Sequence, residues 1–138
     1  MHCFTRGLNI HQNETWRDIS EDLIYSDPRE KRIFDYHRYE LSKYLPDIVK
    51  KIGEKSCFHT GKENFFIIEL VNENGDKQEY EIYFKATKSI KNCLKLFVQS
   101  AYVRDKKHKT SQPHKKKISF FVIAYNVQRN KEIKIPPK

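Results

Sequence analysis

The chain has 138 residues, which fits one domain with a buried core, and 38% hydrophobic residues argue against global disorder despite 33% charged residues. No apolar run approaches the roughly 18 residues that a membrane-spanning helix needs, and the N-terminus has no apolar signal core. We therefore expect a cytoplasmic protein with no membrane partner. The three cysteines, Cys3, Cys57 and Cys93, are widely spaced, so neither a disulfide framework nor a metal site is expected.

The formal net charge of +9 is concentrated in one part of the chain. Residues 85–117 hold eleven lysine or arginine residues and one acid, whereas the rest of the chain holds 16 basic and 17 acidic residues. Solubility alone does not require such a concentration. The pattern indicates a polyanionic partner, with nucleic acid as the first candidate.

The first helix pattern lies near the N-terminus. Trp16, Ile19, Leu23 and Ile24 fall on one face of a short amphipathic helix, and Thr15 precedes them as a capping residue. This pattern predicts a helical extension within residues 1–26.

Residues 27–54 carry the clearest helix signal. Asp27 is a capping residue, Pro28 suits the first helical position, and Gly53 is typical of a helix C-terminus. Pro46 removes a backbone donor in the middle of this region. We therefore expect a kink, or two helices that meet there.

Four runs in the second half of the chain predict strands: residues 65–71, 79–86, 93–104 and 118–127. Asn74-Gly75 is a strong hairpin signal between the first two. The run 118–127 is apolar on both faces, as a central strand would be. A further short strand at residues 56–60 is compatible with the sequence.

The expected fold class is α+β, with N-terminal helices packed on a four-stranded antiparallel sheet. A single domain would span residues 1–138, with the extension at 1–26, the helical region at 27–54, the sheet at 58–127 and a polar tail at 128–138. One face of the sheet would be partly open and would carry the polar residues of the alternating strands.

The chemistry that this surface suggests is RNA cleavage through the 2′-hydroxyl, because the common nucleotide-loop, hydrolase and metalloprotease motifs are absent. That reaction needs a base, an acid and cations on the phosphate, and it needs no metal or other cofactor. Two structural alternatives stay open. One is that Tyr102 is a core aromatic residue, and the other is that Arg104 pairs with Asp105 or Glu81. The candidate catalytic residues are Lys85, Tyr102, Arg104 and His108.

A larger set of residues is expected to hold the phosphate backbone. The alternative interpretation of the lysines is that they only form the solvated tip of a loop. The candidate nucleic-acid-binding residues are His59, Lys62, Ser100, Lys106, Lys107, Lys109, His114, Lys115, Lys116 and Lys117.

The order of elements and the stretch LKLFVQSAYVRD (residues 94–105) resemble the RelE/ParE-like toxin superfamily over residues 30 to 127 or so. The resemblance implies metal-independent mRNA cleavage, often on the ribosome, with Lys85, Tyr102 and Arg104 in the positions of the family's sheet residues. It also implies an antitoxin as a protein partner. Some relatives of that superfamily act on gyrase and do not cut RNA.

Three functions are compatible with these features. The first is a toxin-type endoribonuclease, with RNA as the favoured partner and ribosome-bound mRNA as one form of it. The second is a non-catalytic module that binds RNA or DNA, for which the charge alone suffices. The third is a protein-interaction domain that meets an acidic partner such as an antitoxin.

Overall fold

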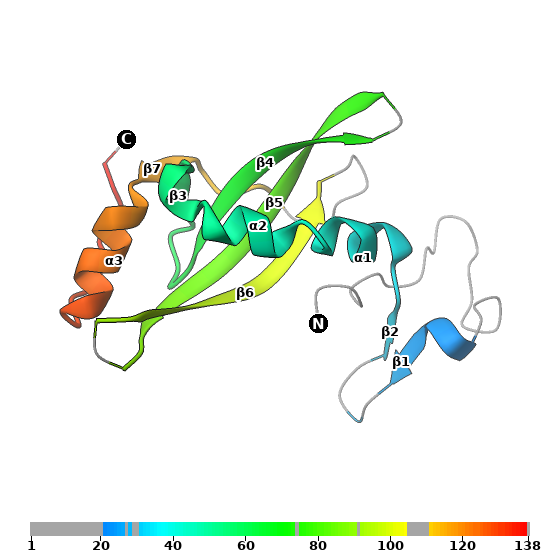
Figure 1. The fold of residues 1–138 in the computed structure, drawn as a ribbon, viewed down its shortest axis with the longest axis horizontal. Helices are drawn as coiled ribbons and strands as arrows, with labels where there is room; N and C mark the ends of the chain where they lie inside the picture. Colours follow the sequence, from blue (N-terminus) through cyan, green and yellow to red (C-terminus); the bar gives the residue numbers. More distant parts are fainter. Residues whose placement is uncertain are drawn as a thin grey trace. The chain divides into compact units, whose positions relative to one another are not determined.

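The computed structural model describes residues 21–26, 28, 31–73, 75–90, 92–104 and 111–137 (Figure 1). The chain forms two compact units, Met1–Leu45 and Pro46–Lys138. Both helices and strands occur and the strands pair antiparallel, so the protein is of the α+β class.

The described part of the first unit begins with a short hairpin. A 3-10 turn, η3 (Glu21–Leu23), leads into β1 (Ile24–Ser26), which pairs antiparallel with β2 (Lys31–Ile33). The predicted helix over residues 15–24 is therefore wrong at its C-terminal end, and the rest of it lies outside the described residues. The β-branched residues Ile24 and Ile33 stand opposite each other and favour strands.

The helical region starts later than predicted. Helix α1 (Tyr36–Ser42) begins after Asp35, whose carboxylate accepts a hydrogen bond from the backbone N–H of Arg38 at 3.2 Å. The helix expected from Pro28 onward is wrong over residues 31–33, which form β2, and the expected cap at Asp27 lies outside the described residues. The expected meeting of two helices near Pro46 is correct: α2 (Leu45–Lys50) follows a turn at residues 43–44.

The second unit is built on a five-stranded antiparallel sheet in the order β6-β5-β4-β3-β7. It also contains the 3-10 turn η4 (Ile52–Glu54) and most of α2. Three of the four predicted strands are present, and their observed bounds are close to or wider than the predicted ones. The strands are β3 (Cys57–His59), β4 (Phe65–Glu73), β5 (Asp76–Lys88), β6 (Leu94–Val103) and β7 (Lys116–Ile118).

The hairpin predicted between the first two long strands is present. Glu73 pairs with Asp76 at its end, and Gly75 adopts a φ of +84° in the turn. That left-handed conformation is the one that glycine tolerates best.

The fourth predicted strand is wrong. Residues 118–127 contain only the end of β7 at Ile118, and the chain then forms α3 (Phe120–Gln128). Ser119 caps the helix, because its hydroxyl oxygen accepts a hydrogen bond from the N–H of Phe121 at 3.2 Å. An apolar run of this length fits a strand or a helix, and the flanking capping residue decides between them.

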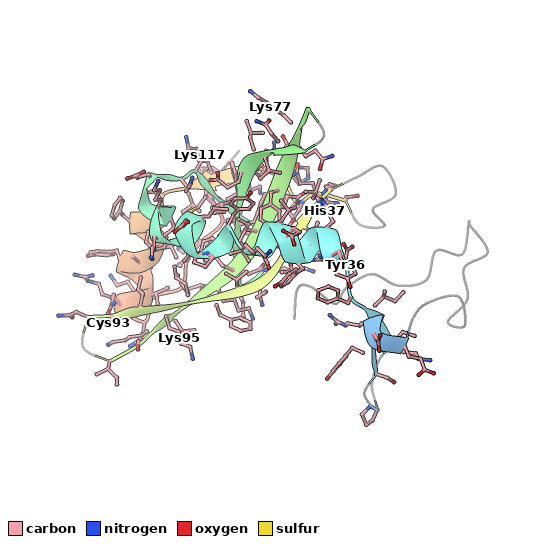
Figure 2. The ribbon with its side chains drawn as sticks, turned by 45° about the vertical axis from the view of Figure 1, so that its right-hand side comes forward. Tyr36, His37, Lys77, Cys93, Lys95 and Lys117 are labelled. Atoms are coloured by element: carbon pink, nitrogen blue, oxygen red, sulfur yellow. The ribbon has the colours of Figure 1, made fainter. Side chains whose placement is uncertain are left out.

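The core of the second unit lies on both faces of the sheet. Phe66 and Glu81 on one face are fully buried, and so are Ile82 and Ala101 on the other. The expectation of a partly open polar face is therefore wrong at the centre of the sheet. In Figures 1 and 2 the ribbon of α2 runs across β4 and β5.

Cys57 is fully buried in this core, while Cys93 is exposed. Burial raises the pKa of the Cys57 thiol to about 11, so about one molecule in a thousand carries the thiolate at pH 8. In a Cys3→Ser variant we expect one thiol to react with a disulfide reagent at pH 8 and the second to react only after denaturation. The Cys57 rate should rise as pH approaches 11. Two equally fast thiols in the folded protein would contradict this burial.

Candidate functional site

An ion pair lies at the C-terminal end of β6, where the sequence predicts catalysis. The carboxylate of Glu81 accepts hydrogen bonds from Arg104, from Nε at 2.7 Å and from Nη2 at 3.2 Å. The hydroxyl of Tyr83 donates a further bond to Glu81 at 2.6 Å. Arg104 Nη2 also donates to the hydroxyl oxygen of Tyr102 at 3.2 Å. Glu81 is 0% exposed, so this charge depends on its partners.

The electrostatics of this cluster favour a structural role. The hydrogen bonds to Glu81 raise the pKa of Arg104 above its usual range. Burial, followed by the bond to Glu81, raises the pKa of Tyr83. Both groups therefore keep their protons at all physiological pH values. Of the alternatives left open by the sequence, the pairing of Arg104 with Glu81 is the one that the structure contains.

Aromatic rings connect this cluster to the far side of the sheet. Phe58, Phe66, Tyr83 and Tyr102 come from four successive strands, β3 to β6, and neighbouring ring centroids lie 5.2, 5.2 and 5.7 Å apart. Such contacts add to the stabilisation from burial. Tyr102 is thus an edge member of the core, with its hydroxyl beside Arg104.

Lys85 does not join this cluster. It lies on the same face of β5 as Glu81 but four residues further along, which is about 13 Å in a strand. Ser100 stands opposite Tyr83. Of the candidate catalytic residues, Arg104 pairs with Glu81 and contacts Tyr102, Lys85 lies apart from them, and His108 lies outside the described residues.

A β-bulge changes which residues of β6 share a face. Tyr83 pairs with Ser100, but its neighbour Phe84 pairs with Val98, so one extra residue, Gln99, lies between them. Regular alternation of side chains along β6 is interrupted at this point, because a bulge shifts the side-chain pattern by one. Phe97 therefore lies on the same face as Ser100, although the two are three residues apart.

The register brings distant basic residues to one end of the sheet. Lys116 stands opposite His59, which stands opposite Phe65, and Phe65 stands opposite Phe84. The next positions outward hold Lys85 on β5 and Lys115 before β7. The loop after β3 contributes Lys62 to the same end. We call this region the basic end, defined by Lys62, Lys85, Lys88, Lys95, Lys115 and Lys116.

The lysines of the basic end are available to a ligand. Lys62, Lys88, Lys95 and Lys115 are exposed, and Lys85 and Lys116 are partly exposed. Within the described residues, none of the six ammonium groups has a carboxylate within 4 Å. Figure 2 shows Lys95 of this end far from Lys77, which marks the opposite end of β5.

His59 is a core residue in this structure. The residue is 4% exposed, Nδ1 accepts a hydrogen bond from the N–H of Gly61 at 2.9 Å, and Nε2 lies 3.1 Å from the carbonyl oxygen of Ile133. An accepting Nδ1 places the proton on Nε2, which donates to that carbonyl. With both nitrogens engaged, His59 has no nitrogen left for a phosphate.

A hollow of about 590 Å³ lies beside His59, between the sheet and the chain that follows α3. Phe65 and Ala86 belong to its lining, and three lysines there are accompanied by Glu63 and Glu132. Its mixed charge favours no particular ligand.

The remaining predicted residues fall into two groups. His114 and Lys117 are exposed, at and before β7. Lys106, Lys107, His108 and Lys109 lie outside the described residues. Sequence reasoning did not select Lys88, Lys95 or Phe97 as site residues; the signal that could have found them is the cross-strand register of the hairpin, in which Lys85 faces Phe97 and Thr87 faces Lys95.

Two further properties concern the described part of the chain. It contains no group of three or more His, Cys, Asp or Glu side chains that could hold a metal ion. It also contains no helix long and apolar enough to cross a membrane.

The fold and this surface define an α+β protein whose antiparallel sheet carries exposed lysines at one end. The sequence model of the YjaZ family matches residues 1–128. The chain is also 35% identical over 139 residues to Protein YjaZ of Escherichia coli (strain K12), an alignment that covers all of this chain and 72% of the relative. The chain therefore belongs to the YjaZ family.

This membership corrects the expected resemblance to the RelE/ParE-like toxins. That resemblance depended partly on a four-stranded meander whose last strand is the helix α3, and no sequence motif supported it. No solved structure matches the chain significantly.

Proposed function

We propose that this protein binds nucleic acid through the basic end of its sheet. The observation that carries the proposal is the convergence of six lysines from four separate segments at that end, without carboxylate partners in the described residues. Clustered, unpaired cations make a surface that attracts polyanions.

The spacing of these lysines supports a long polyanion better than a small anion. Strands β6 and β7 stand at opposite edges of a five-stranded sheet, which separates them by roughly 19 Å. One small anion cannot contact both groups. A nucleic acid backbone offers phosphates over that distance.

Binding without cleavage is the form of the proposal that the contacts support. Arg104 already donates hydrogen bonds to Glu81 and to the hydroxyl oxygen of Tyr102, and Lys85 is about 13 Å from Glu81 along β5. No contact among the described residues favours catalysis. Incubation of the protein with total RNA in EDTA provides the direct measurement of cleavage.

The triple variant Lys62→Ala, Lys115→Ala, Lys116→Ala tests the proposal. We expect weaker binding of a fluorescent single-stranded RNA, with the salt dependence of log K reduced by about 2, since each lost phosphate contact removes about 0.7. Fluorescence anisotropy from 50 to 200 mM salt measures both quantities.

The matched control is Lys77→Ala, an exposed lysine on β5 at the opposite end of the sheet. It should leave both the affinity and the salt dependence unchanged. Absence of binding by the unmodified protein at low salt, or an unchanged slope in the triple variant, would refute the proposal.

A further inference from the structure

The β5–β6 hairpin projects beyond the rest of the sheet. Phe84 is the last residue of β5 that pairs with β4, so residues 85–88 pair only with residues 94–97 of β6. We call this two-stranded segment the arm. Its four extra residues extend it by about 13 Å.

One face of the arm combines an exposed aromatic ring with cations. Phe97 is 59% exposed, stands directly opposite Lys85, and shares its face with Lys95. Opposite residues in an antiparallel pair have Cβ atoms about 5 Å apart. Residues 82–104 contain no acid, so none of the arm's own residues offsets the charge around the ring.

The other face of the arm is supported. Ala86 lies on that face and lines the same hollow as Val127 of α3, and α3 packs against β5 and β6. At the base of the arm, the amide of Asn64 donates a hydrogen bond to the side-chain oxygen of Gln99 at 2.8 Å. The ring of Phe97 therefore lies on a strand whose other face is packed against the protein, and not on an exposed loop.

We propose that the arm binds single-stranded nucleic acid, with one base stacked on Phe97 and the adjoining phosphates on Lys85 and Lys95. The proposal rests on the proposed function and specifies its ligand. A base inside a duplex has both faces covered by its neighbours, whereas a base in a single strand offers a face to an aromatic ring. The pattern of one exposed ring between two lysines on the same face fits this second case.

The test compares substitutions of one residue. Phe97→Ala should weaken binding of single-stranded RNA by about 5- to 150-fold, the usual range for loss of one base–aromatic stack. Phe97→Leu should lose nearly as much, because leucine keeps the apolar bulk but has no π-face. Phe97→Trp should retain binding. Phe121→Ala removes a ring of α3 that is 69% exposed and should have no effect.

Two further ligands define the specificity. A single-stranded DNA of the same sequence should respond to Phe97→Ala like the RNA if stacking alone provides the contact, and a smaller response would assign part of it to the ribose. Duplex DNA should respond less than twofold. An equal loss with the duplex would overturn the single-strand assignment, since it would mean that the arm enters a groove.

The outcomes separate this inference from the proposed function. If the Lys62, Lys115, Lys116 variant loses affinity while Phe97→Ala and Phe97→Leu retain it, the stacking inference is wrong and nucleic-acid binding stands. If Phe97→Leu keeps the RNA affinity that Phe97→Ala loses, the contact is apolar and the stacking inference is wrong. If the unmodified protein binds none of the three ligands, both proposals fail.

Discussion

Substitution of Arg104 by methionine should lower the free energy of unfolding by about 3–5 kcal/mol, the usual result of removing one partner from a buried ion pair. Glu81 is 0% exposed, and the guanidinium supplies two of its hydrogen bonds. Without Arg104 the carboxylate stays buried with Tyr83 as its remaining described partner. The lost energy is therefore mainly the cost of an uncompensated charge.

Urea denaturation of the single and double variants measures this effect. Adding Glu81→Gln to Arg104→Met should recover most of the loss, because glutamine is neutral and still accepts a bond from Tyr83. Arg129→Ala is the control: its guanidinium lies 3.6 Å from the ring centre of Tyr125 on the surface, and its loss should cost less than about 0.5 kcal/mol. A cost below about 1 kcal/mol for Arg104→Met would contradict the buried pair.

Loss of stability in an Arg104 variant can by itself abolish RNA binding or cleavage. A variant of Arg104 that loses RNA binding or cleavage must first be shown to be folded under the assay conditions. The recovered double variant provides that comparison, since it lacks the guanidinium but keeps the fold.

Phe66→Ala should cost about 3–5 kcal/mol, as expected for a large aromatic side chain removed from a packed core. Phe66 is 0% exposed and lies between Phe58 and Tyr83 in the row of rings across the sheet. The substitution leaves a cavity at the centre of the sheet and removes two ring contacts.

Phe97→Ala is the matched control on stability, because it removes the same side chain from an exposed position. Its cost should stay within about 0.5 kcal/mol. Thermal or urea denaturation of both variants measures the contrast. Similar costs for the two substitutions would contradict the described positions of the two rings.

Local sequence signals were sufficient for much of the sheet. The runs around residues 65–71, 79–86 and 93–104 are strands, and glycine after Asn74 occupies a left-handed turn. Alternation of side chains and turn residues act over a few neighbouring positions, so they are visible in the sequence. The pattern failed at residues 118–127, where an apolar run is compatible with strand and helix alike and Ser119 starts a helix.

The candidate site was predicted only in part. The concentration of charge in residues 85–117 drew attention to this segment, and the nucleic-acid function inferred from it stays a proposal. The pairing of Arg104 with Glu81 was one of the alternatives left open by the sequence, but the complete burial of Glu81 and the bond from Arg104 to Tyr102 were not predicted. The role proposed for Phe97 depends on a bulge at Gln99, and a bulge has no clear signal in a single sequence.

The sequence by itself determined the α+β composition, the central hairpins and the excess of positive charge, because each depends on residue type and near neighbours. The tertiary structure alone decided where that charge goes. Strand order and register brought Lys62 and Lys115 to the same end of the sheet as Lys85, and placed Arg104 beside the buried Glu81. Pairings between residues far apart in the chain are set by packing of the whole sheet, which no local pattern specifies.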